Sequence, residues 1–159
     1  MLAAPVAAPV PRCHTADLRV TLGRGGVGLG NVERPVYFRN RSGHACFVFG
    51  YAGFGLEDAS HRVQPSRVLW GSTYFDADTG PHRVVLKPGE RAQTLLAWGD
   101  NSGPQDPQTY PCQPKSVWLE VTPPDERTFV RVPFGANVCA RGTLESSALR
   151  RFRPGKRSA

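Results

Sequence analysis

The sequence has no isoleucine, only three lysines and a single methionine among its 159 residues. It also has no run of about 20 apolar residues, which excludes a membrane-spanning helix, and no internal repeat of the length found in solenoid proteins. One methionine and four histidines disfavour a soft-metal or haem protein. Leucine, valine and phenylalanine are nevertheless present as 12, 16 and 8 residues. This apolar content predicts one small folded domain with a modest core.

Positive charge is concentrated at the C-terminal end. The formal net charge is +7, of which the last ten residues contribute five, so the rest of the chain carries +2. The five basic residues are Arg150, Arg151, Arg153, Lys156 and Arg157. Because Pro154 and Gly155 prevent a lasting helix, residues 147–159 are predicted to form a basic disordered tail. The tail is interpreted either as a solvated end or as a weak contact to anionic lipid or wall polymer, and no specific nucleic-acid binding is expected.

The chain pattern is typical of an all-β protein. Apolar and polar residues alternate in short segments separated by turns every 8 to 12 residues, and no window of twelve residues has a sustained helical period. The expected strands cover residues 17–22, 32–39, 46–51 with a continuation toward 58, 63–70, 82–87, 92–98, 116–121 and 128–134. We therefore predict an antiparallel β-sandwich over residues 13–146.

Residues 1–12 hold three prolines and no charge before Arg12, which indicates a Pro/Ala-rich linker. This segment lacks the basic start and the unbroken apolar stretch of a signal peptide. We expect a mature chain from which an export signal has been removed.

Four cysteines are spread along the chain without a Cys-x-x-Cys pair, which favours disulfides over zinc or redox chemistry. Three connectivities are possible. If strands 17–22 and 32–39 form a hairpin, Cys13 comes close to Cys46. If strands 116–121 and 128–134 pair in the same way, Cys139 returns beside Cys112. We predict the disulfides Cys13–Cys46 and Cys112–Cys139, which point to an extracytoplasmic location.

Several stretches resemble one protein family. They are FRNRSGHACFVFGYAGFGLEDA (38–59), VVLKPGERAQTLLAWGD (84–100), CQPKSVWLEVTPPDERTFVRVPF (112–134) and the later Cys139, Gly142 and Leu144. In this order and spacing they are similar to domain of unknown function 4232, a family of mainly actinobacterial secreted proteins and lipoproteins. The resemblance implies an immunoglobulin-like β-sandwich outside the cytoplasm and supplies no reaction. The chain departs from the family pattern at its end, LESSALRRFRPGKRSA.

The segment 70–82 is the candidate ligand loop. It carries the aromatic residues Trp70, Tyr74 and Phe75 next to the acidic residues Asp76 and Asp78. Aromatic side chains on a loop supply rigid contact area for a protein or glycan, but they also cap the open end of a sandwich. The spacing of the two acids resembles the start of a calcium loop. However, a third acid is missing and Lys87 stands where a bidentate glutamate is required.

No catalytic or metal-binding set emerges from the other residue types. The histidines are far apart in sequence, and no nucleophile motif surrounds a serine. We expect no catalytic residue, no metal and no cofactor. The favoured function is a non-catalytic, secreted or cell-envelope module with a binding or structural role, monomeric, whose partner is an envelope protein or glycan. The alternative is a secreted enzyme or metal-binding carrier that uses loop 70–82.

Overall fold

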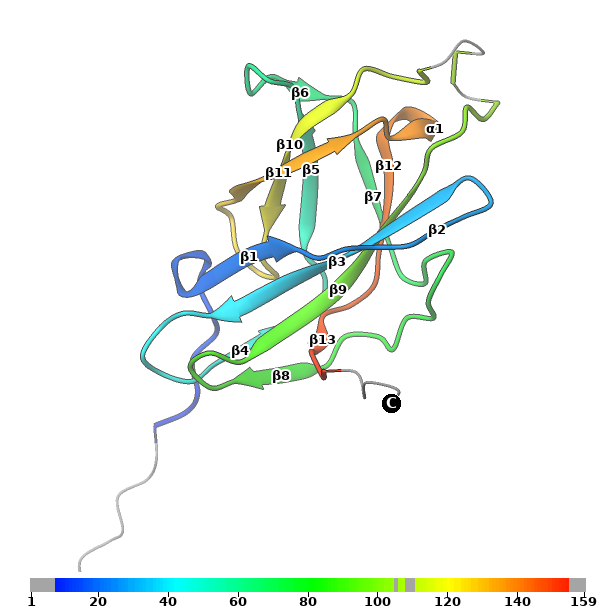
Figure 1. Ribbon diagram of the computed structural model, residues 1–159. Coiled ribbons are helices and arrows are strands. Elements are labelled where there is room, and N and C mark those ends of the chain that lie inside the picture. Colours follow the sequence, from blue (N-terminus) through cyan, green and yellow to red (C-terminus); the bar gives the residue numbers. More distant parts are fainter. Residues whose placement is uncertain (1–7, 105, 108–110, 155–159) are drawn as a thin grey trace, which may run out of the picture.

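The computed structural model describes residues 8–104, 106–107 and 111–154. Within them the chain forms thirteen short strands, one 3₁₀ turn and one helical turn (Figure 1). The elements are η1 (Thr15–Asp17), β1 (Leu18–Leu22), β2 (Val27–Gly28), β3 (Asn31–Asn40), β4 (Cys46–Phe49), β5 (Gly53–Glu57), β6 (Val63–Gln64), β7 (Arg67–Trp70), β8 (Arg83–Leu86), β9 (Arg91–Gly99), β10 (Ser116–Thr122), β11 (Val130–Ala136), α1 (Cys139–Gly142), β12 (Thr143–Ser146) and β13 (Arg150–Arg151). The all-β prediction is confirmed, and no described helix is long and apolar enough to cross a membrane.

The strands form three sheets. The largest has the order β1-β3-β9-β12-β7, with β2 added to β3 and β13 added to β9. The second has the order β11-β10-β5-β6, and β4 pairs with β8 in a small third sheet. Figure 1 shows the long β3–β9 pair crossing the molecule, with β5, β10 and β11 above it. Because β12 and β7 run parallel, the prediction of a purely antiparallel sandwich is wrong.

Two predicted strands are each divided between different sheets. In the segment 63–70, Pro65 has no N–H to donate to a ladder, and it separates β6 in the second sheet from β7 in the first. Gly50 separates β4 in the third sheet from β5 in the second. Its φ of 102° is a backbone conformation that glycine adopts easily. Gly142 is needed where β12 begins, because a Cβ there would lie 2.0 Å from the Pro65 carbonyl oxygen.

The core joins the two larger sheets. Phe38 and Leu96 from the first sheet and Leu119 and Phe134 from the second are almost completely buried. Trp98 of β9 packs edge-to-face on Phe134, with ring centroids 4.9 Å apart, and is 4% exposed. This aromatic pair joins the two sheets within a core that is otherwise mainly Leu and Val.

Both predicted disulfides are confirmed. Cys13 is bonded to Cys46 and Cys112 to Cys139, with Cα–Cα distances of 4.9 Å and 5.4 Å. The antiparallel ladders β1–β3 and β10–β11 bring each pair together, as the hairpin argument expected. Two disulfides indicate an oxidising, extracytoplasmic environment.

The ends of the folded domain differ from the sequence-based boundaries. At the N-terminal end, Phe47 donates its N–H to the Pro11 carbonyl, and Arg12 makes a 2.8 Å ion pair with Glu126. At the C-terminal end, Ala148 and Leu149 are buried. The linker therefore does not extend to residue 12, and the tail does not begin at residue 147, because both segments bury apolar or hydrogen-bonding groups against the domain.

The first basic residues of the predicted tail belong to the fold. Arg150 and Arg151 form β13 on β9, and they pair with Asp76 at 2.6 Å and Glu90 at 2.8 Å. The prediction of disorder is thus wrong for these two residues, whose charges are already compensated. Arg153 is exposed, while Lys156 and Arg157 lie outside the described residues.

Replacing Phe152 by alanine tests whether the chain is folded this far. Phe152 contacts the Tyr37 ring edge-to-face at 5.2 Å, and the Arg91 guanidinium lies 4.2 Å from its centroid. We expect Phe152→Ala to lower the free energy of unfolding by about 1–2 kcal/mol in chemical denaturation. Arg153→Ala is the control and should have no effect. Equal stability of both variants would contradict a folded C-terminal segment.

Candidate functional site

Trp70 is held at the end of β7 by two contacts. Its indole N–H donates to the Ala52 carbonyl at 3.0 Å, and its ring stacks on Tyr51 with centroids 5.4 Å apart and an interplanar angle of 14°. The Tyr51 hydroxyl in turn donates to Asp78. These contacts fix the orientation of the indole although its residue is 59% exposed.

An open pocket lies beside this stacked pair. Its volume is about 270 Å³. Its lining residues are Phe49, Gly50, Tyr51, Trp70, Pro81, Pro124 and Asp125, and we call it the Trp70 pocket. Phe49 at its wall is 46% exposed, so two large aromatic side chains face solvent together. Exposed aromatic residues grouped around a concavity are typical of a binding site.

The predicted ligand loop is divided by the structure. Trp70 lines the pocket, whereas Tyr74 and Phe75 do not. Tyr74 is 52% exposed and contacts Phe75 edge-to-face at 5.1 Å. Phe75 lies next to Gly28 of β2, where a Cβ would be 3.8 Å from its ring. Only one of the three predicted aromatic residues therefore belongs to the concave surface.

The two predicted acidic residues have structural partners. Asp76 pairs with Arg150, and Asp78 accepts hydrogen bonds from the Ala148 amide at 3.0 Å and the Gly80 amide at 3.2 Å. Burial opposes ionisation of Asp78, but the hydrogen bonds from Tyr51 and these amides hold its pKa below the ordinary value. Both carboxylates thus fasten the loop to the domain.

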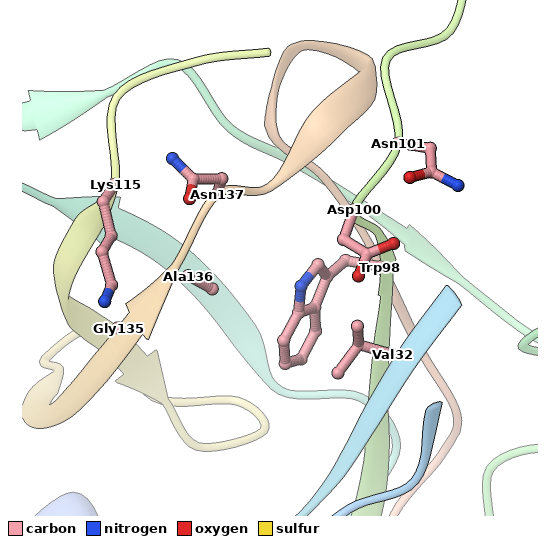
Figure 2. Close-up of a pocket in the computed structure, with 8 residues that line it drawn as sticks. All are labelled: Val32, Trp98, Asp100, Asn101, Lys115, Gly135, Ala136 and Asn137. Carbon is pink, nitrogen blue, oxygen red and sulfur yellow. The ribbon is translucent and has the colours of Figure 1, made fainter. Parts of the chain in front are cut away.

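A second cavity, of about 410 Å³, lies where β9 and β11 end (Figure 2). It is lined by Val32, Trp98, Asp100, Asn101, Lys115, Gly135, Ala136 and Asn137. Figure 2 shows Lys115 and Asn137 on the opposite side from Asp100 and Asn101. Its tryptophan is nearly buried, so this cavity offers a polar rim but little aromatic surface.

A pair of glutamates on the outer face of the second sheet was missed by the sequence analysis. Glu57 is fully buried, and its Oε1 accepts from Arg131 Nε at 2.8 Å and lies 2.9 Å from His61 Nδ1. Its other oxygen, Oε2, accepts no N–H and no Ser, Thr or Tyr hydroxyl from the described residues. Glu120 of β10 hydrogen-bonds to Glu57. A bond between two carboxyl groups requires a proton on one of them.

The environment assigns this proton to Glu120. Burial, followed by the hydrogen bond to Glu57 and the charge of that residue, raises the pKa of Glu120 to about 7. Burial opposes ionisation of Glu57. The hydrogen bonds from Glu120, Arg131 and His61 outweigh this effect and lower the pKa of Glu57 to about 2. The only signal in the sequence was a glutamate in each of two strands, and their pairing depends on the β5–β10 register.

No group of three or more His, Cys, Asp or Glu side chains that could hold a metal ion is found in the part of the chain that the structure describes.

The mostly β architecture and the two buried disulfides define the molecule as a small disulfide-bonded β domain. A family model matches residues 13–150, and the chain belongs to this family, the domain of unknown function family DUF4232. The family resemblance of the sequence motifs is thereby confirmed. No curated protein and no solved structure matches the chain.

Replacing Trp70 by alanine separates a surface role from a core role. We expect a loss of about 1–2 kcal/mol in the free energy of unfolding, because one ring stack and one hydrogen bond are removed from a largely exposed side chain. Thermal and chemical denaturation of the full chain give this value. A loss of about 3–5 kcal/mol, as for a buried tryptophan, would show that Trp70 is core and not a ligand contact.

Proposed function

We propose that the protein is a non-catalytic binding domain of the cell envelope or the secreted space, and that the Trp70 pocket is its ligand site. The observation that carries this proposal is the joint exposure of Trp70 and Phe49 at one concave surface. Water contact with two large rings is unfavourable unless a partner covers them, so their retention there favours recognition.

The pocket is also rigid before any ligand arrives. Tyr51 is fastened through Asp78 to Ala148, and Trp70 is fastened to Ala52. A site whose side chains are already ordered loses little conformational entropy on binding. This supports a binding role over a purely structural one, in which loop aromatic residues would cap the core.

The proposed partner is an envelope protein or glycan, and the proposed state is a monomer. The two disulfides support action outside the cytoplasm. We further propose that the two larger sheets are a variant of an immunoglobulin-like sandwich, supported by the core that they share. The alternative, an enzyme or metal carrier based on loop 70–82, is less favoured because Asp76 and Asp78 are engaged with Arg150 and Tyr51.

Saturation-transfer NMR with soluble peptides and glycans released from a bacterial envelope tests this function. The full chain should transfer magnetisation to at least one component, and the Trp70→Ala variant should not. Asp100→Asn, in the second cavity, is the matched control and should behave as the wild type. Retained transfer in the Trp70 variant, or chemical conversion of the bound component, would contradict the proposal.

A further inference from the structure

The polar atoms of the aromatic residues at the Trp70 pocket are already bonded within the domain. The Tyr51 hydroxyl donates to Asp78, and the Trp70 indole N–H donates to the Ala52 carbonyl. The Gly50 carbonyl accepts the Leu149 amide. Of the other described lining residues, Phe49, Pro81 and Pro124 carry no polar side-chain group, and the carboxylate of Asp125 only accepts. The described lining therefore offers no spare side-chain N–H or O–H to a ligand.

What the pocket does offer is negative potential. The faces of aromatic rings attract cations. Among the described residues of the lining, Asp125 is the only charged one; it is exposed and makes no side-chain hydrogen bond or ion pair with another described residue. Asp78, held ionised, accepts the Tyr51 hydroxyl and so increases the electron density of that ring.

The domain's own neighbouring cation is held away from the pocket. Arg83 is the register partner of Phe49 across β4 and β8. Its guanidinium, however, lies 4.1 Å from the ring centroid of Phe47, and it donates to the Val10 carbonyl. The Phe49 ring is thus left for an external group.

We propose that the Trp70 pocket binds a quaternary ammonium group, that is, an organic cation without N–H donors. This inference rests on the proposed binding function and names its ligand class. A sugar would find no side-chain donor for its hydroxyl groups. In the described lining, a primary ammonium would find only the Asp125 carboxylate and the Tyr51 phenol oxygen as side-chain acceptors, and any N–H bond left without one of them would lose its water. A trimethylated nitrogen needs no acceptor and gains from the rings and the carboxylate together.

Titration of the full chain with choline, followed by NMR shifts, tests the inference. The comparison ligand is the neutral alcohol in which a quaternary carbon replaces the nitrogen, and a second comparison is ethanolamine. We expect choline to bind at least tenfold more tightly than either. Trp70→Ala and Asp125→Asn should each weaken choline binding severalfold or more, whereas Asp100→Asn should not change it.

Two results would overturn the inference. Equal affinity for choline and the neutral alcohol would show that the pocket selects apolar bulk, which leaves the binding function intact. Absence of choline binding would refute the ligand class, while the envelope screen decides the binding function separately.

Vesicles of phosphatidylcholine, compared with vesicles of phosphatidylglycerol, distinguish the source of the cation. Trp70-dependent binding to phosphatidylcholine supports a lipid headgroup, and choline binding without vesicle binding supports a soluble cation.

Discussion

Replacing all four cysteines by alanine should leave the domain largely unfolded at 37 °C. The disulfides close loops with sequence separations of 33 and 27 residues. The loss of chain entropy in the unfolded state makes each of them worth roughly 3–4 kcal/mol. Together they contribute about 7 kcal/mol, which is comparable to the whole stability of a small domain. Circular dichroism during thermal denaturation measures the loss.

Two comparisons control this result. The pairs Cys13/Cys46 and Cys112/Cys139 should each, when replaced alone, give roughly half of the loss. The wild-type protein reduced in denaturant should lose most of this stability, and the fourfold variant somewhat more, because it also lacks the buried sulfur atoms. A reduced protein that melts within a few degrees of the oxidised one would contradict the stabilising role of the disulfides.

The glutamate pair predicts a stability that depends on pH in both directions. Glu120 has a raised pKa, so its contribution is fully present below its unfolded value of 4.5 and is lost as the pH rises through about 7. Glu57 has a lowered pKa, so its contribution is present above 4.5 and is lost as the pH falls toward 2. The pair therefore stabilises the folded state most near pH 4.5 to 5, where the two carboxyl groups share one proton.

Glu120→Gln isolates the alkaline part of this profile. The amide donates to Glu57 as the protonated acid does, but it has no proton to lose. Between pH 5 and pH 8 the wild type should lose on the order of 2 kcal/mol through this pair, after allowance for the partial exposure of Glu120, and the variant should not.

Melting temperatures at both pH values measure the effect. Arg131 and His61 face the pair and remain present in the variant. Glu145, whose pKa is raised by burial, provides the matched control. Glu145→Gln should remove only the smaller pH dependence of stability that Glu145 itself contributes. If Glu120→Gln loses as much stability between pH 5 and pH 8 as the wild type, the two carboxyl groups do not share a proton.

Local patterns in the sequence predicted much of the fold. Alternation located β1, β3, β9, β10 and β11 within a few residues, and the hairpin argument identified both disulfides. These features depend on neighbours along the chain or on antiparallel partners reached by short connections. The change of sheet at Pro65 and the parallel pairing of β7 with β12 depend on contacts between distant segments, and alternation contains no information on them.

The same limit explains the candidate site. Trp70 was identified because an aromatic residue beside acids in a loop is unusual, but the sequence alone does not show that Phe49 and Pro124 join it in space. The acids Asp76 and Asp78 were selected for their charge, and the structure uses that charge for internal bonds to Arg150 and Tyr51.

The central claim, that ligands bind at the Trp70 pocket, has a direct test because the chain has three tryptophans in three different places. Trp70 lines the pocket and Trp98 lines the second cavity. Trp118 lies beside His61 at the glutamate pair, with ring centroids 5.4 Å apart. The measurement is the nitrogen–proton correlation spectrum of the three indole N–H groups during titration with choline. The claim predicts that the Trp70 signal shifts while the other two stay in place. A shift of the Trp98 or Trp118 signal with an unchanged Trp70 signal would contradict it.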